Sequence, residues 1–246
     1  MDGKVIHGIG YFVFFYAAIL VIHLLMKAMP VPVVKVSQPR SERFWAIGLS
    51  IVGTVLLSIH FYCRARNIVI PPAFKVTMFV FALPVPLAIY LFAKGYGLAD
   101  LGLRLRPIKI WAVSLAVWVL AGLFAYLTNA NGMQLQKAMS YGFTEFILQG
   151  VITAGLSEEF LRFVLQTRLR NVIDSPLFCV VIASAVWSLM HLPIDLYQGG
   201  NAYEIARYTI QIIPIGFVWG YMTYRTGSIL PAVFVHGFNI WGLQNS

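Results

Sequence analysis

The chain has 246 residues, of which 59% are hydrophobic and only 11% are charged, and its formal net charge at pH 7 is +9. An average soluble domain carries about 25% charged residues, so this composition excludes an ordinary soluble protein and predicts a chain that folds in a lipid bilayer. Basic residues that meet anionic lipid headgroups at the membrane surface explain the positive charge. The charge therefore indicates no nucleic-acid partner.

Apolar segments long enough to cross a membrane recur along the whole chain. A helix of about 20 apolar residues spans the hydrocarbon core, because its backbone N–H and C=O groups are satisfied internally. The first segment is interpreted as a retained span and not a signal peptide, since no good small-residue cleavage site follows it. Together the apolar segments predict an all-α polytopic transmembrane bundle of about eight helices. The predicted spans are residues 8–26, 44–63, 76–93, 109–129, 143–170, 176–197, 205–224 and 228–243.

Basic residues in the predicted loops give the orientation. If the loops alternate sides, one side carries eleven Lys and Arg residues, Arg168 and Arg170 among them, the other carries six, and Arg162 lies within the bilayer. The richer side is expected to face the cytoplasm, which places both termini outside. Short loops and a compact length favour a cell membrane, the bacterial inner membrane in particular.

Prolines and glycines inside the predicted spans indicate how the helices are shaped and packed. Pro84 and Pro214 are expected to kink their helices or to free carbonyl groups that neighbouring helices must satisfy. Gly216 and Gly220 form a GxxxG pair, which predicts close packing against another helix.

The chain is expected to divide into two parts. Three N-terminal spans cover residues 1–94, and a core of five spans covers residues 95–246.

Two adjacent glutamates, Glu158 and Glu159, lie in the middle of an apolar run, with Arg162 close behind them. An acidic residue at the centre of a spanning helix costs roughly 2.5–3.5 kcal/mol, so such residues usually face a bundle interior or a wet cavity and mark function. At about 1.5 Å rise per residue, Glu158, His191 and His236 lie roughly 16–22 Å from the cytoplasmic ends of their helices. The similar depths predict one shared site.

Three ordered motifs in this region carry a family resemblance. They are residues 157–162 with the glutamate pair and Arg162, residues 187–191 from Trp187 to His191, and residues 227–239 with His236 and Asn239. They resemble the motifs of the CAAX-protease and bacteriocin-processing family of intramembrane glutamic endopeptidases. That family has a glutamate pair followed by an arginine, an aromatic residue four positions before a histidine, and a histidine followed by asparagine or aspartate. The resemblance covers residues 95–243.

The resemblance implies an intramembrane endopeptidase that acts on a peptide or a membrane-anchored protein tail, with no cofactor and no metal ion. One glutamate would activate water with His191, the other would be held by Arg162, and His236 and Asn239 would stabilise the oxyanion. Two residues separate Glu159 from Arg162, where the family usually has three. Superposing the arginines places Ser157 and Glu158 on the family's two glutamates. Either Glu158 or Glu159 can therefore be the catalytic carboxylate, with Glu158 preferred.

Other interpretations stay open from the sequence. The buried polar groups can form a satisfied network that holds helices in register, as in a non-catalytic scaffold or an immunity-type membrane protein of the same fold. Glutamate and two histidines can bind zinc, which commonly takes three protein ligands in catalytic sites. Ser157 with His191 or His236 can form a serine dyad. A transporter with a glutamate proton relay is a further interpretation, although the chain has no internal repeat of the kind many transporters use.

Overall fold

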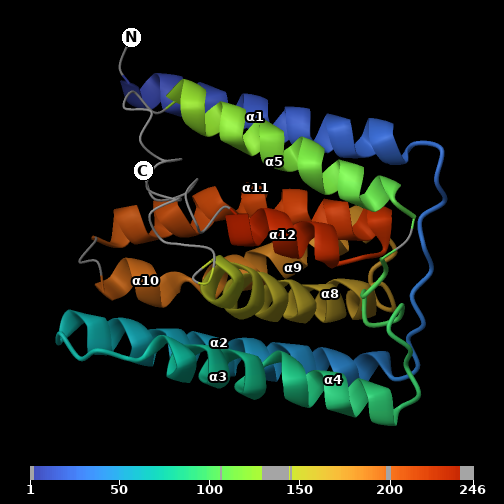
Figure 1. The fold of residues 1–246 in the computed structure, drawn as a ribbon, viewed down its shortest axis with the longest axis horizontal. Coiled ribbons are helices and arrows are strands. Elements are labelled where there is room, and N and C mark those ends of the chain that lie inside the picture. The colour runs from blue at the N-terminus through green and yellow to red at the C-terminus, as the bar shows by residue number, and fades with distance from the viewer. Residues whose placement is uncertain (1–2, 106, 129–143, 145, 198–200, 239–246) are drawn as a thin grey trace.

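The computed structural model describes residues 3–105, 107–128, 144, 146–197 and 201–238, and this part of the chain is all-helical, without β-strands (Figure 1). The prediction of an all-α fold is confirmed. The elements, in chain order, are α1 (Gly3–Met26), α2 (Pro39–Ala65), α3 (Pro72–Ala82), α4 (Pro84–Ala93), α5 (Lys109–Thr128), the π-helical segment η1 (Phe146–Leu156), α8 (Ser157–Leu169), α9 (Pro176–Leu189), α10 (Leu192–Tyr197), α11 (Ala202–Thr226) and α12 (Leu230–Phe238).

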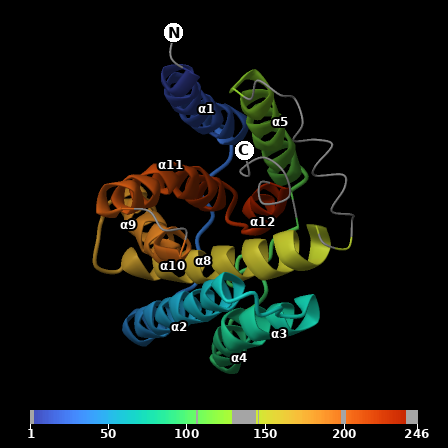
Figure 2. The ribbon, with the colours of Figure 1, turned by 90° about the vertical axis from the view of Figure 1, so that its left-hand side faces the viewer.

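The helices form layers, with η1 and α8 at the centre. In Figure 1, α1 and α5 lie side by side at one face, α2, α3 and α4 lie at the opposite face, and α9, α11 and α12 lie between them. In Figure 2, η1 and α8 cross the molecule between the α2–α4 layer and the remaining helices. Helix α8 packs against α2 and α9, and η1 packs against α12 and α3. The segment with the two glutamates therefore contacts both halves of the bundle.

The outer helices present an apolar surface. Large apolar side chains such as Phe12, Ile51, Phe81 and Leu115 are exposed on α1, α2, α3 and α5. Soluble monomers rarely expose contiguous apolar patches larger than a few hundred Å². Two helical segments in the described part of the chain are long and apolar enough to cross a membrane. They are Pro39–Ala65, which is α2, and Ala73–Ala93, which comprises α3 and α4. The shorter apolar helices are Gly10–Met26, Lys109–Phe124 and Pro176–Leu189. The figure of about eight spans remains a prediction.

Two of the predicted spans are interrupted, both at prolines. The third divides at Pro84 into α3 and α4, and the sixth divides around His191 into α9 and α10. Pro193 has no N–H to donate to the preceding turn, so a single α-helix cannot run through this position without losing a hydrogen bond. Pro214 lies inside α11, which continues past it. Nearby, the Ser188 hydroxyl of α9 donates a hydrogen bond to the carbonyl of Thr209 on α11.

Glycines allow two close helix contacts around the site. A Cβ atom on Gly216 would lie 2.8 Å from the Trp187 ring, and one on Gly220 would lie 2.8 Å from Val180. The GxxxG pair therefore packs α11 against α9, and this prediction is confirmed. The contact between η1 and α12 is closer still, because a Cβ on Gly155 would lie 2.6 Å from the Val233 carbonyl oxygen.

Replacing Gly155 with alanine is expected to destabilise the protein by about 1–3 kcal/mol, the usual range for overpacking a tight contact. The added methyl group would meet the backbone of α12, which cannot move aside as a flexible side chain can. Gly48→Ala is the matched control, since a Cβ there meets nothing within 4 Å. Thermal unfolding in detergent checks this. Equal melting temperatures for the Gly155→Ala and Gly48→Ala proteins would contradict the close contact.

Arg168 corrects the charge count on which the orientation was based. It is fully buried within the protein, so its charge is not available to lipid headgroups. Its Nε donates to Glu42 Oε2 at 2.6 Å, and the other oxygen of Glu42 accepts from the Tyr96 hydroxyl. The count therefore becomes ten against six, which leaves the predicted orientation unchanged. The buried pair connects α2 to the end of α8.

Candidate active site

The structure brings five of the six predicted site residues together. Glu158, Glu159 and Arg162 lie in the first turns of α8, immediately after η1. His191 lies in the turn after α9, and His236 lies near the end of α12. The contact between η1 and α12, which depends on Gly155, sets His236 beside the two glutamates. The sixth predicted residue, Asn239, lies outside the described residues.

Glu159 is held on both carboxylate oxygens. Arg162 Nη2 pairs with Oε2, and His236 Nδ1 donates to Oε1 at 2.9 Å. The other guanidinium nitrogen, Nη1, donates to the carbonyl of Gly216 on α11 at 2.9 Å. The Glu159 side chain is fully buried. A buried carboxylate that is paired and hydrogen-bonded in this way is fixed in place, and its charge is compensated by Arg162.

Glu158 has a different environment, although it is the next residue in the chain. Its side chain retains 15% exposure, and its Oε2 accepts a hydrogen bond from Trp187 Nε1 at 2.5 Å. The same oxygen lies 3.7 Å from His191 Nε2 and 3.6 Å from His236 Nε2. Among the described residues no hydrogen bond uses Glu158 Oε1. Both separations are longer than a direct hydrogen bond.

The two histidines direct the same ring atom toward Glu158. His191 Nδ1 contacts the carbonyl oxygen of Trp187 at 3.0 Å. A carbonyl only accepts hydrogen bonds, so the proton of His191 is assigned to Nδ1, and the neutral ring keeps Nε2 as an acceptor. His236 Nδ1 donates in the same way to Glu159, which also leaves Nε2 on the side of Glu158. The site thus contains a partly exposed glutamate with one carboxylate oxygen near two imidazole nitrogens.

Two tryptophans enclose these polar groups and were not predicted as site residues. Trp219 stacks on His236 with ring centroids 4.1 Å apart, and the Trp187 ring meets His191, His236 and Trp219 edge-on. The Arg162 guanidinium lies 5.6 Å from each indole ring. The sequence marked Trp187 only as the aromatic residue four positions before His191. Its contact with a carboxylate had no signal in the motif, and Trp219 had none at all.

The π-helical backbone of η1 determines where Ser157 points. The Ser157 hydroxyl donates to the Ile152 carbonyl at 3.4 Å, and the Thr153 hydroxyl donates to the Leu148 carbonyl at 2.7 Å, both five residues back along the chain. Ser157 is fully buried, and within the described residues its hydroxyl bonds neither His191 nor His236. The serine dyad therefore has no support from the geometry. Irregular π-helical turns occur frequently at functional sites.

A zinc site is another of the alternatives that the sequence leaves open. In the described ranges no group of three or more His, Cys, Asp and Glu side chains is arranged to hold a metal ion. Cys63 and Cys179 are both free thiols on separate helices.

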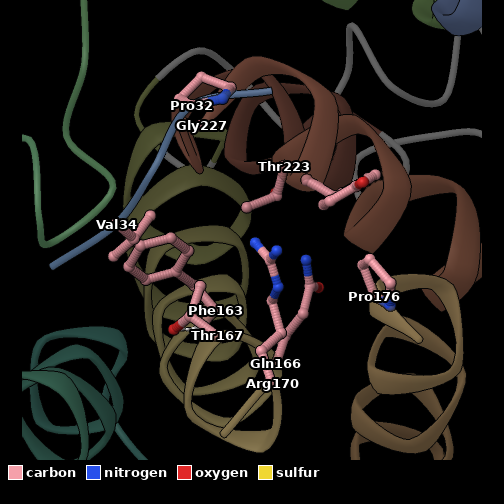
Figure 3. A pocket seen from close by; sticks show the side chains of 10 residues that line it. Pro32, Val34, Phe163, Gln166, Thr167, Arg170, Pro176, Thr223 and Gly227 are labelled. Atoms are coloured by element: carbon pink, nitrogen blue, oxygen red, sulfur yellow. Dashed lines mark hydrogen bonds between the residues drawn. The ribbon is translucent and has the colours of Figure 1, made fainter. Parts of the chain in front are cut away.

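A small cavity lies beyond the site toward the end of α8 (Figure 3). Its volume is about 20 Å³, and Gln166, one helical turn after Arg162, points into it together with Arg170. Gln166 also donates to the Gly220 carbonyl at 3.2 Å, which repeats the Arg162 contact with Gly216 one turn along α11. A single water needs about 10–15 Å³, so this space cannot hold a peptide.

Comparison with known proteins agrees with the motifs. Residues 140–241 match the sequence model of a family described as type II CAAX prenyl endopeptidase, Rce1-like. No curated protein and no solved structure matches the chain. The matched range contains all three motifs and lies inside the predicted core of residues 95–246. Residues 140–241 are therefore a region similar to the type II CAAX prenyl endopeptidases, and this match supports the resemblance of the three motifs to the CAAX-protease and bacteriocin-processing family.

Proposed function

We propose that the protein is an intramembrane glutamic endopeptidase that hydrolyses a peptide bond in a membrane-anchored or membrane-associated peptide or protein tail. One observation carries this proposal. The Glu158 side chain is partly exposed, and its Oε2 lies 3.7 Å from His191 Nε2 and 3.6 Å from His236 Nε2, beside a second carboxylate that is fully buried and paired. Two carboxylates in such different environments can divide the work of a hydrolase.

Glu158 is assigned the role of general base. With His191 it binds a water molecule, and it takes a proton from that water as the water oxygen attacks the carbonyl carbon of the substrate. The C–N bond then breaks, and the proton held by Glu158 passes to the leaving nitrogen. The products are a carboxylic acid and an amine, so one water is consumed for each bond broken. Glu159 is unsuited to this role because both of its oxygens are already bonded.

His236 is assigned to the oxyanion that forms during the attack. Its Nδ1–H is fixed by Glu159, so its Nε2 is directed at the space beside Glu158. Preorganised donors of this kind often make the largest single contribution to acyl-transfer catalysis. A histidine must carry a proton on Nε2 to donate there. Asn239 is proposed to stabilise the same oxyanion, as the family resemblance implies.

The substrate is proposed to be a peptide segment that reaches into the bilayer near the site. The protein is assigned to the cell membrane. A bacterial inner membrane is preferred because the loops of the protein are short. The partners of the chain are then the substrate and the bilayer, and no nucleic acid is involved. No cofactor is needed for the reaction as written above.

A non-catalytic scaffold or immunity-type protein is the second candidate, and one observation favours it. The Glu159, Arg162 and His236 side chains bond to one another and to the Gly216 carbonyl, which would also hold α8, α11 and α12 in register. A satisfied polar network does not require catalysis. Glu158, which is partly exposed, and His191 lie outside this network, and this is why hydrolysis is preferred.

Proteolysis by the purified protein in liposomes tests the proposal, with a panel of prenylated and unmodified tail peptides as substrates. We expect cleavage that continues in the presence of a metal chelator and in a Ser157→Ala protein, because Ser157 bonds only its own helix. Loss of cleavage on chelation, reversed by added zinc, would favour a zinc-dependent protease. Loss of cleavage in a folded Ser157→Ala protein would favour a serine nucleophile. A folded protein that cleaves none of the peptides would favour the scaffold.

A further inference from the structure

We propose that Trp187 is a positioning residue that fixes both members of the water-activating pair, Glu158 by its side chain and His191 by its main chain. This inference rests on the proposed function and concerns a residue that the family motif marks only as aromatic. The Trp187 indole N–H donates to Glu158 Oε2 at 2.5 Å, and the Trp187 carbonyl oxygen accepts from His191 Nδ1 at 3.0 Å. One residue thus contacts a carboxylate on α8 and an imidazole beyond the end of α9.

The indole ring itself is held firmly, which makes it suitable for positioning another group. Trp187 is 4% exposed, and its ring lies edge-on to Trp219 with centroids 5.4 Å apart. The Arg162 guanidinium lies over the Trp187 ring. Gly216 packs so closely against the same ring that a Cβ atom on Gly216 would lie 2.8 Å from it. A donor that cannot turn away places its acceptor accurately.

The chemistry of the indole fits the role assigned to Glu158. A tryptophan N–H only donates, so it cannot exchange protons with the carboxylate or compete for water as a base. Hydrogen bonds to an ionised acceptor are roughly twice as strong as those between neutral groups. The bond therefore fixes Oε2 near the two histidines. It leaves Oε1 available to the incoming water.

The contact with His191 sets the second half of the pair. Because the Trp187 carbonyl holds the proton on Nδ1, the His191 Nε2 faces Glu158 at 3.7 Å with its lone pair available to a water molecule. This bond uses the backbone, so it survives any substitution of the side chain. Phenylalanine at position 187 would keep an aromatic ring and the His191 contact, and it would remove the N–H donor together with part of the ring that packs against Gly216. The two contributions of Trp187 can thus be separated.

The test compares Trp187→Phe with a matched control, Trp111→Phe. Trp111 also donates an indole hydrogen bond, at 3.1 Å, but its acceptor is the Leu105 carbonyl outside the site. We expect Trp187→Phe to lower kcat roughly 10- to 100-fold with little change in KM, since misplacing a reacting group by about 1 Å costs on the order of 10²-fold. Trp111→Phe should retain wild-type kcat. Equal kcat in the wild-type and Trp187→Phe proteins would overturn the proposal.

A second measurement needs no activity, so it separates failure of this proposal from failure of the proposed function. The chain has six tryptophans, whose indole N–H signals can be resolved by nuclear magnetic resonance of ¹⁵N-labelled protein in detergent. Loss of one signal in Trp187→Phe assigns that resonance. It should shift in Glu158→Gln, because the acceptor changes from a carboxylate to an amide, while the Trp111 signal stays in place. An unmoved Trp187 signal would overturn the proposal, even in a protein that cleaves nothing.

Discussion

A Glu158→Gln protein is expected to fold as the wild type does and to lose peptidase activity by about 10²- to 10⁴-fold, the usual contribution of a general base. Glutamine preserves the size of the side chain and the acceptor for Trp187, but it cannot take a proton from water. Because Glu158 is partly exposed and pairs with no arginine, the substitution leaves no buried charge uncompensated. Peptide cleavage and thermal unfolding, measured on the same preparation, check both halves of this expectation.

Glu159→Gln is the matched control, since it makes the same chemical change one residue away. It should lower the melting temperature as well as the activity, because it leaves the buried Arg162 guanidinium without its carboxylate. A Glu158→Gln protein with near wild-type activity beside an inactive but fully stable Glu159→Gln protein would reverse the assignment. The open choice between the two glutamates is therefore decided by one pair of variants.

Breaking the Glu42–Arg168 pair is expected to destabilise the protein by about 3–5 kcal/mol, the range found when one partner of a buried ion pair is removed. Both side chains are fully buried, and Arg168 Nε and Tyr96 both donate to the Glu42 carboxylate. Glu42→Gln would leave the guanidinium charged in an apolar interior. Unfolding in detergent with increasing denaturant measures the loss.

A double variant distinguishes a lost pair from lost packing. Glu42→Leu combined with Arg168→Met removes both charges, and it is expected to recover much of the stability lost in Glu42→Gln. Asp174→Asn serves as the surface control, because Asp174 is exposed between α8 and α9. Stability of Glu42→Gln equal to that of Asp174→Asn would contradict the buried pair.

Several features of the fold followed from composition and spacing alone. The apolar segments predicted the helices, because only a helix satisfies its own backbone in hydrocarbon. The equal depths of Glu158, His191 and His236 predicted that these residues meet, and the structure brings them together. The GxxxG pair predicted a close helix contact for a local reason, since only glycine permits that approach, and the structure shows that the partner of α11 is α9.

Other features depend on contacts that no local pattern encodes. Arg168 resembles a surface charge in the sequence because its partner, Glu42, is 126 positions away. The π-helical turns of η1 depend on how Gly155 meets α12 after folding. The division of labour between the two glutamates depends on which neighbours reach them. Trp187 and His191 reach Glu158, Arg162 reaches Glu159, and His236 contacts both.

Cleavage of a tail peptide in water enriched in oxygen-18 tests the central claim most directly. The wild-type protein in liposomes should yield two fragments, and the new carboxyl terminus should carry one oxygen-18 atom from the attacking water. The Glu158→Gln protein, folded to the same melting temperature, should yield none or only traces. Labelled fragments formed at the wild-type rate by Glu158→Gln, or a wild-type protein that leaves every peptide intact, would contradict the account.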